Sequence, residues 1–334
     1  FSRMSTLERA LLSCSRNVKM LLTRDLPSSE KTLVSQRIQS LFDYNVGDGK
    51  NKRGHLLLSS FDAVNGKREW KETASRSAAA IEVLQSYLLI ADDMMDESET
   101  RRGKDCWYRR EGIGLSAIND VLLLQSGVES EMREAFRGHP NERLALTAFE
   151  ATVRKTIVGQ LMDTSSTSIE HFNWQRYSQL VEHKTSHYTF VLPLTLGLLA
   201  AEVEIPMEKV TRLALSIGYL FQSQDDWLDV YGKTALTGKL GSDIKDQKCT
   251  WLSCKAVEKS GSIKGSFHRL KSAFDNGDED EVRRIYEEIK LSEEFKRFED
   301  EYSDILINEM ESVPHLGLTS LLKGLVTETR RRQK

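Results

Sequence analysis

The sequence has few of the residues that interrupt helices: only five of its 334 residues are proline. Proline removes a backbone donor and breaks a helix interior, so this scarcity permits long helices. Stretches that alternate apolar and polar residues between turn residues, as half-buried strands do, are also missing. Apolar residues recur instead at i, i+3, i+4 and i+7, which is the helical period. We therefore expect an all-α protein.

The expected helices are long, and several exceed 20 residues. Long helices suit a large bundle that holds a site in its centre, and we expect a single domain over residues 1–334. Pro193 falls inside one of these helices and should kink it. The periodicity predicts helices at 29–44, 72–96, 114–136, 141–165, 172–199, 207–231, 250–259, 278–290, 293–312 and 316–331.

Other missing features exclude classes of protein. The four cysteines form no CxxC pair, which is typical of reduced thiols in a reducing compartment. No apolar run approaches the ~20 residues of a membrane span. The net charge of −3 gives no basic excess for nucleic acid. The start lacks the apolar region of a secretory signal, so we expect a cytoplasmic protein; because residue 1 is Phe, a mitochondrial transit segment removed from upstream stays open as an alternative.

Two acidic clusters each close an apolar run. The first is DDMMD at residues 92–96, and the second is DDWLD at residues 225–229. On a helix the first and last aspartates of each cluster share one face, with ~6 Å of rise between them. Carboxylates at a helix C-terminus oppose the helix dipole and repel one another, so a solvated helix end is a weak explanation. A cation would stabilise them, and oxygen ligands with free water positions suit Mg²⁺.

Basic residues follow both clusters at short distances. Arg101 and Arg102 follow the first, while Lys239 and Lys248 follow the second with Asp243 between them. Each of these alone would be an ordinary surface charge. Together with two acidic sites, they match a diphosphate held between metal ions and cations. Further cations of this kind are Lys50, Arg53 and Lys184.

The motifs resemble those of the farnesyl diphosphate synthases, which are trans-isoprenyl diphosphate synthases. The runs LIADDMMDESETRRGKDCWY and FQSQDDWLDVYG are similar to the two aspartate-rich motifs of that family. GKNKRG, GQLMD and KTSHYTFVLP match three further blocks in the same order. The resemblance spans about residues 40–334. It implies the isoprenoid synthase fold, an all-α bundle around a deep central cavity, which is usually a homodimer.

The resemblance also implies roles for the matching residues. Mg²⁺, about three ions per site, would be bound directly or supported by Asp92, Asp93, Asp96, Asp163, Asp225, Asp226, Asp229 and Asp243. The allylic diphosphate would be held by Arg101, Lys184 and Lys248, with Gln160 and Lys239 nearby. Isopentenyl diphosphate would be bound by Lys50, Arg53, Gln85 and Arg102, with Phe221 beside it. Thr185 and Gln222 would face the developing allylic cation, so the catalytic set is Arg101, Lys184, Thr185, Gln222 and Lys248.

The implied activity condenses isopentenyl diphosphate with dimethylallyl or geranyl diphosphate to give farnesyl diphosphate or a close chain-length relative. The alternative is a terpene synthase derived from this family, which would ionise farnesyl or geranyl diphosphate to a sesquiterpene or monoterpene. Lys50, Arg53 and Arg102 favour elongation, because a cyclase has no second diphosphate and buried unpaired cations are costly. A helical scaffold without enzymatic activity would leave the two acidic clusters unexplained.

Four features depart from the family pattern. Tyr87 and Leu88 stand five and four positions before the first aspartate, where the family usually has two aromatic residues that set chain length. The run Ala78–Ala80 is smaller than usual. Asp48 interrupts a pair of glycines, and His187 stands where an aromatic is usual. These departures would reshape the cavity without changing the diphosphate chemistry.

His183 and His187 are four residues apart on an expected helix, a spacing that zinc ligands can have. No HExxH motif accompanies them, and His183 is adjacent to the diphosphate lysine. A packing or hydrogen-bonding role is therefore favoured.

Overall fold

The computed structural model describes residues 4–165, 168–232, 241–261 and 265–330. Within these ranges the regular structure is helical apart from one short antiparallel hairpin, so the predicted all-α fold is confirmed. No helix in this described part is both long enough and apolar enough to cross a membrane. The chain divides into two compact units, Phe1–Ala151 with Leu192–Met207, and Thr152–Val191 with Glu208–Lys334. The single domain expected over residues 1–334 stays a prediction.

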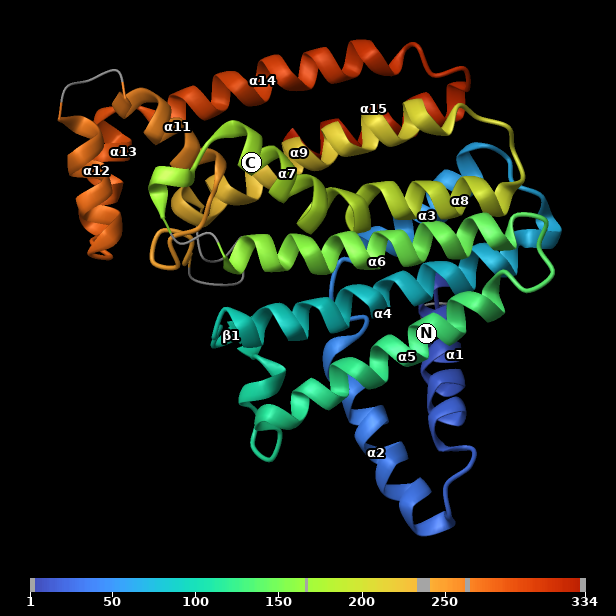
Figure 1. The fold of residues 1–334 in the computed structure, drawn as a ribbon. Helices are drawn as coiled ribbons and strands as arrows, with labels where there is room; N and C mark the ends of the chain where they lie inside the picture. Colours follow the sequence, from blue (N-terminus) through green and yellow to red (C-terminus); the bar gives the residue numbers. More distant parts are fainter. Residues whose placement is uncertain (1–3, 166–167, 233–240, 262–264, 331–334) are drawn as a thin grey trace. The chain divides into compact units, whose positions relative to one another are not determined.

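The first unit is built around α4, which packs against α1, α3, α5 and α8 (Figure 1). The hairpin of β1 and β2 follows α4 directly and turns the chain back on itself. The elements of this unit are α1 (Thr6–Thr23), α2 (Ser28–Asn45), α3 (Lys52–Ala63), η1 (Arg68–Trp70), α4 (Lys71–Met95), β1 (Thr100–Arg101), β2 (Lys104–Asp105), η2 (Trp107–Arg109), η3 (Gly114–Ser116), α5 (Ala117–Ala135) and α8 (Leu192–Ala201).

Small side chains let α4 be buried on all sides. Ala78, Ala79 and Ala80 are fully buried, so the neighbouring helices approach its backbone closely. Gly54 at the start of α3 shows this, because a Cβ there would lie 3.1 Å from the carbonyl oxygen of Ala78. The backbone N–H of Gly54 donates to Oε1 of buried Glu82 at 2.6 Å. The start of α3 is thereby fixed against α4.

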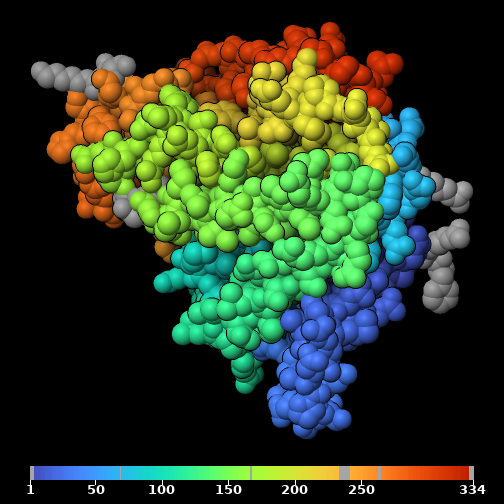
Figure 2. Space-filling view, turned by 45° about the vertical axis from the view of Figure 1, so that its right-hand side comes forward, coloured from blue at the N-terminus to red at the C-terminus, as the bar shows by residue number. Residues whose placement is uncertain are grey.

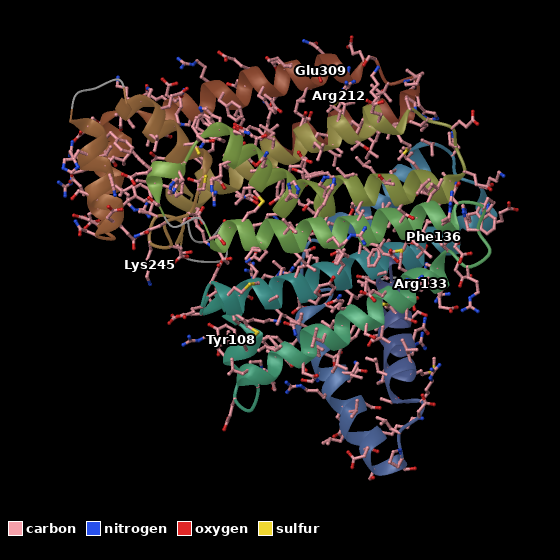
Figure 3. All side chains as sticks on the ribbon, viewed as in Figure 1. Tyr108, Arg133, Phe136, Arg212, Lys245 and Glu309 are labelled. Carbon is pink, nitrogen blue, oxygen red and sulfur yellow. The ribbon has the colours of Figure 1, made fainter. Side chains whose placement is uncertain are left out.

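Helices α1 and α2 form a hairpin whose tip projects from the first unit, seen as the blue extension in Figure 2. α1 begins with a capping box, in which Ser5 and Glu8 exchange hydrogen bonds between side chain and backbone. Its apolar face packs on α4 and α5. Figure 3 shows Tyr108 beside the hairpin of β1 and β2, with Arg133 and Phe136 at the opposite end of α5.

The second unit contains a core in which Tyr177, Trp251 and Phe295 are almost completely buried. The long helix α6 (Glu142–Thr164) begins in the first unit and continues into the second. The other elements of this unit are η4 (Ile169–His171), α7 (Trp174–Val181), the π-helical segment η5 (Glu182–Val191), α9 (Met207–Tyr231), α11 (Trp251–Gly261), α12 (Ser266–Asp275), α13 (Glu279–Glu288), α14 (Leu291–Met310) and α15 (Leu316–Arg330).

The observed elements differ from the predicted helices in three ways. α1, α3 and α12 were not predicted, although α1 buries Leu7, Leu11 and Val18 at the helical period. The hairpin of β1 and β2 has strands of two residues, which are too short to show a period. The helix predicted at 172–199 is divided into α7, η5 and α8, so its winding changes just before Pro193 rather than at a kink in one α-helix.

Candidate active site

At the C-terminal end of α4, two carboxylates of the first cluster pair with an arginine from the hairpin of β1 and β2. Asp93 is only 3% exposed, and it accepts a hydrogen bond from Nε of Arg101 at 2.7 Å. Nη2 of the same arginine donates to Oδ2 of Asp92 at 3.2 Å. Burial raises the pKa of Asp93, and the Arg101 guanidinium opposes that rise. Asp92 and Asp96 remain half-buried, so the two outer carboxylates are the accessible ones.

Cations gather next to this acidic end. Arg102, in the left-handed backbone region at φ 55°, lies against Gly49, where a Cβ would be 2.7 Å from Nη2. A side chain at position 49 would therefore require this guanidinium to shift. Burial lowers the pKa of Arg102, and the neighbouring positive charges of Arg101 and Arg53 lower it further. Like charges held together in this way favour the binding of an anion.

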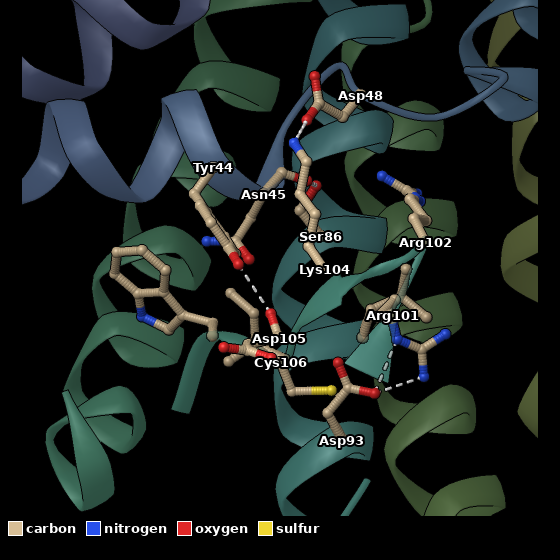
Figure 4. Close-up of a pocket in the computed structure, with 13 residues that line it drawn as sticks. Tyr44, Asn45, Asp48, Ser86, Asp93, Arg101, Arg102, Lys104, Asp105 and Cys106 are labelled. Atoms are coloured by element: carbon tan, nitrogen blue, oxygen red, sulfur yellow. Dashed lines mark hydrogen bonds and ion pairs between the residues drawn. The ribbon is translucent and has the colours of Figure 1, made fainter. Parts of the chain in front are cut away.

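The hairpin, α2 and α4 enclose a small cavity of ≈ 80 Å³ beside these cations. Figure 4 shows Arg101 reaching Asp93, and Lys104 paired with Asp48 from the loop before α3. The hydroxyl of Tyr44 donates to the carbonyl oxygen of Asp105 at 2.9 Å, which ties α2 to the hairpin. The cavity therefore has a charged rim and a fixed wall.

The four residues predicted for isopentenyl diphosphate are all in this unit. Arg53 is buried at the N-terminal turn of α3, close enough to Arg102 to influence its pKa. Lys50 is exposed in the loop between α2 and α3, and Gln85 is half-buried on α4. The structure thus brings Arg53 and Arg102 into one neighbourhood, and it places Lys50 three residues from Arg53.

A buried support behind the hairpin was missed at the sequence level. The indole Nε1 of Trp107 donates to Oδ2 of Asp120 at 2.8 Å, and Arg37 donates to the same oxygen at 2.6 Å. This network fixes the segment after β2 against α2 and α5. Asp120 and Arg37 stand far from Trp107 in the sequence and belong to no motif, so only the fold reveals their connection.

The acidic end of α9 is held by neutral groups. Oδ2 of Asp226 accepts hydrogen bonds from the Tyr177 hydroxyl at 2.6 Å and from the Trp251 backbone N–H at 2.8 Å. Its Oδ1 accepts from Nε2 of Gln222 at 2.9 Å. Burial raises the pKa of Asp226 to about 7, although these hydrogen bonds lower it. Asp226 is therefore engaged by the protein, while Asp225 beside it is half-buried.

Gln222 connects this end of α9 to η5. Its Oε1 accepts a hydrogen bond from the hydroxyl of Thr185 at 2.6 Å, so Thr185 and Gln222 are in contact. Phe221 meets Phe190 edge to face, with ring centroids 5.4 Å apart. Thr185 and Gln222, which were predicted to face the allylic cation, are therefore in contact in the second unit, and their role there stays a prediction.

The carboxylate of Asp229 accepts hydrogen bonds from the loop that carries Asp243. Its Oδ2 accepts from the backbone N–H of Asp243 at 3.0 Å, and its Oδ1 accepts from that of Ser242 at 3.3 Å. Asp229 on α9 and Asp243 in the loop are both half-buried. Their predicted support of a metal ion stays a prediction.

Two lysines share one buried carboxylate on α6. Nζ of Lys184 and Nζ of Lys248 donate to Oδ2 of Asp163, at 2.6 and 2.9 Å. Burial acts to raise the pKa of Asp163, but the two lysines outweigh it and hold that pKa below its ordinary range. One negative charge between two positive charges leaves a net positive site, which favours a phosphate oxygen nearby.

The turn of α6 just before Asp163 carries a further hydrogen-bond donor, Gln160. Nε2 of Gln160 is buried, and within the described ranges it has no hydrogen-bond partner. A buried donor of this kind costs free energy unless an acceptor reaches it, and a bound diphosphate would supply one. The predicted neighbours Gln160, Asp163, Lys184 and Lys248 therefore form one polar group, whose role in binding stays a prediction.

Some predicted features lie beyond this description. Lys239 falls outside the described residues. In the ranges that are described, no three His, Cys, Asp or Glu side chains form a group that could hold a metal ion. His183 and His187 have ring centroids 6.4 Å apart. His187 is engaged by Lys155 and Glu182 instead, which agrees with the favoured hydrogen-bonding role.

A family model for polyprenyl synthetases matches residues 35–289. The chain belongs to the polyprenyl synthetase family. Among its relatives, this polyprenyl synthetase is 32% identical to the farnesyl pyrophosphate synthase of Panax ginseng, over 99% of this chain and 100% of that protein. It is 31% identical to the farnesyl pyrophosphate synthase of Gallus gallus, over 89% of this chain and 84% of that one.

Solved structures agree with these sequence relatives. The T. brucei farnesyl diphosphate synthase complexed with risedronate superposes with a TM-score of 0.86 and 27% sequence identity, covering 98% of this chain and 100% of that one. The same enzyme complexed with minodronate gives a TM-score of 0.87. The resemblance and the isoprenoid synthase fold expected from the motifs are thereby confirmed for this polyprenyl synthetase.

Proposed function

We propose that this polyprenyl synthetase condenses isopentenyl diphosphate with dimethylallyl or geranyl diphosphate to give farnesyl diphosphate. The observation that carries the proposal is the presence of two separate groups of cations. Arg53 and Arg102 lie together in the first unit, and Lys184 and Lys248 share Asp163 in the second. A reaction that joins two diphosphate esters needs two such groups, and the relatives named above are farnesyl synthases.

The alternative, a terpene synthase that uses one diphosphate ester, gains no support from these relatives. Elongation is therefore the function that these relatives support.

The donor set fits magnesium. Asp92 and Asp96 are half-buried with oxygen ligands on one face of a helix, and Asp225 ends α9 in the same way. Two or fewer carboxylates per ion, with water and substrate phosphates completing the shell, is the usual mode of Mg²⁺ binding. When bound, Mg²⁺ supplies Lewis-acid stabilisation of the departing diphosphate. We propose the number of ions, about three per site, on the family resemblance alone.

The side chains of this enzyme would act around that step. Lys184 and Lys248 would bind and orient the leaving diphosphate of the allylic substrate. Phe221 and Phe190 would provide an apolar wall that excludes water from the carbocation. Thr185 would present its hydroxyl oxygen to the developing positive charge, held in place by Gln222.

Tyr87 is the residue best placed to limit chain length. It is 3% exposed on α4, and its hydroxyl has no hydrogen-bond partner within the described ranges. Leu88 beside it is half-buried. We propose this large buried ring as the floor that stops a growing chain.

We propose a homodimer from an apolar face formed by η3 and the start of α5. Leu115, Ile118 and Leu122 stand at i, i+3 and i+7, and they are 77%, 54% and 57% exposed. Apolar side chains on one helical face at this exposure indicate a covered surface, and the symmetric contact of two copies is the commonest cover. Light scattering would report twice the mass of 38.1 kDa, and Ile118→Glu should return the monomer.

Incubation of the purified protein with Mg²⁺ and two substrate sets tests the function. The first set is isopentenyl diphosphate with dimethylallyl or geranyl diphosphate, and the second is geranyl or farnesyl diphosphate alone. Elongation predicts a longer diphosphate from the first set only. Arg53→Ala should mainly raise KM for isopentenyl diphosphate, whereas the exposed Arg143→Ala on α6 should leave it unchanged. A hydrocarbon or alcohol terpene from the second set, without elongation in the first, would overturn the proposal.

A further inference from the structure

One face of α6 meets η5 at three successive turns. Lys155, Gly159 and Asp163 are spaced four residues apart, so they point to the same side of the helix. Nζ of Lys155 is 2.7 Å from Nε2 of His187, and Asp163 accepts from Lys184 at 2.6 Å. Between these contacts α6 touches the backbone of η5. The segment η5, which carries Lys184, is thus held against α6 at both Lys155 and Asp163.

Gly159 makes this approach possible. A Cβ at position 159 would lie 2.2 Å from the backbone nitrogen of Lys184 and 2.6 Å from the carbonyl carbon of His183. No side chain fits at those distances, so the two backbones are in direct contact. Small changes in how η5 seats on α6 must therefore move Lys184 and its neighbour Thr185.

The π-helical winding of η5 depends on contacts between residues five apart. Oγ of Ser186 donates to the carbonyl oxygen of Val181 at 3.1 Å. Nε2 of His187 is 3.3 Å from Oε1 of Glu182. In an α-helix, residues five apart point in different directions, whereas the wider π turn brings them together. His187 therefore touches both α6, through Lys155, and its own segment, through Glu182.

The same nitrogen of His187 cannot serve both partners. A lysine ammonium has donors and no acceptor, so Nε2 can accept from Lys155 only when the ring is neutral, with its proton on Nδ1. A protonated ring carries a hydrogen on Nε2, which would repel Lys155 and donate to Glu182. The two arrangements exclude each other, and the proton decides between them.

We propose that His187 is a proton-sensitive positioning residue for Lys184 and Thr185, a role that rests on the proposed function of those two residues. In its neutral form it ties η5 to α6 through Lys155. When protonated it releases Lys155 and pairs with Glu182 within η5, which loosens the seat of Lys184 on Asp163.

The charges around the ring favour the neutral form at neutral pH. Burial lowers the pKa of His187, as do the positive charges of Lys155 on α6 and of His183 on η5, while Glu182 raises it. The native state therefore binds the proton less readily than the unfolded chain. The Lys155 contact is fully formed above the ordinary histidine pKa of ~6.5, and it is lost as the pH falls through the lower native value.

The test compares KM for geranyl diphosphate at about pH 7.5 and about pH 5.5, with isopentenyl diphosphate and Mg²⁺ saturating. His187→Gln keeps an acceptor for Lys155 but cannot be protonated. It should preserve the KM of the unchanged enzyme at the higher pH and remove the rise at the lower pH. His187→Leu has no acceptor, so its KM should be raised at both pH values by about tenfold, the equivalent of one charged hydrogen bond.

A matched histidine controls for the titration of the substrate. His268 is exposed on α12, and His268→Gln should retain the full rise in KM at low pH. Lys155→Met should raise KM at the higher pH as His187→Leu does, while leaving the KM for isopentenyl diphosphate unchanged. A pH profile of His187→Gln identical to that of the unchanged enzyme would overturn the proposal.

A second measurement does not depend on activity. NMR titration of the histidine rings, assigned by the signal lost in His187→Gln, should show His187 titrating below ~6.5 in the full chain, with its neutral form protonated on Nδ1. Lys155→Met should move that titration upward. If His187 titrates near its ordinary pKa and its neutral form carries the proton on Nε2, the positioning role is wrong even when the enzyme is active. Failure of the proposed function would appear separately, as absence of elongation at every pH.

Discussion

The acidic ends of α4 and α9 carry the same motif and differ in what holds it. Each helix has 25 residues and ends in a DDxxD cluster. The middle carboxylate is buried in both, as Asp93 and as Asp226. Asp93 pairs with the charged guanidinium of Arg101, whereas Asp226 accepts from neutral groups of Tyr177, Gln222 and Trp251.

This difference separates two uses of a buried carboxylate. At α4 the partner is a cation predicted to bind substrate, so Asp93 sets the position of a functional group. At α9 the partners come from α7 and α11, so Asp226 mainly joins the helices of the second unit. Removing the middle carboxylate should therefore affect catalysis at α4, where it is Asp93, and folding at α9, where it is Asp226.

The largest effect is expected at the outer carboxylates, where the two ends should behave alike. Asp92→Ala and Asp225→Ala should each lower kcat by about 10²–10³, because each removes a ligand from the clamp on the leaving diphosphate. Steady-state assays of elongation measure this loss. Glu97→Ala, next to the first cluster and exposed, is the control and should retain activity. Full activity in EDTA would remove the metal from the explanation.

Replacing the middle carboxylates, Asp93 and Asp226, should affect stability to different degrees. Asp226→Ala leaves three buried donors without an acceptor, so it should lower the free energy of unfolding by about 2–5 kcal/mol. Asp93→Ala should cost less stability, because the Arg101 side chain is 26% exposed and can be hydrated. Chemical denaturation of both variants gives the comparison. Equal losses would show that the kind of partner does not matter.

The pH dependence of stability sharpens the same point. The pKa of Asp226 is raised to about 7 in the folded protein, above its unfolded value of ~3.9. The folded state therefore holds this proton more tightly, and stability should fall as the pH rises from ~4 to about 7 and then level off. Thermal unfolding without metal should show this fall. Asp226→Asn, which mimics the protonated form, should reduce it, whereas Asp93→Asn should not reduce it to the same degree.

The smallest change concerns product length, with little loss of rate. Tyr87 and Leu88 precede the first cluster, and Leu220 and Phe221 occupy the corresponding positions before the second. Tyr87→Ala should lengthen the product, because it removes the proposed floor. Leu220→Ala is the matched control, since Leu220 is fully buried and should affect stability alone. Chromatography of the dephosphorylated products decides; an unchanged product from Tyr87→Ala would place the floor elsewhere.

Local sequence predicted the long helices, whereas the roles of the site residues came from the family resemblance and stay predictions. α4, α5, α6 and α9 lie within a few residues of their predicted bounds, because apolar residues at the helical period are a local signal. The motifs predicted roles for Thr185, Gln222 and Lys184, and the structure adds the contacts of Thr185 with Gln222 and of Lys184 with Asp163. No motif indicated Arg37 and Asp120, which contact each other across 83 residues and support Trp107.

The sequence by itself determined that two DDxxD clusters end apolar helices, since spacing along a helix fixes which carboxylates share a face. Only the tertiary structure decided which partner each buried carboxylate received. Tyr177 and Asp226 are 49 residues apart, and Lys155 and His187 are 32 apart. Burial and charge act through space, so the pKa of Asp226, the π winding of η5 and the close approach at Gly159 depend on neighbours that no local pattern specifies.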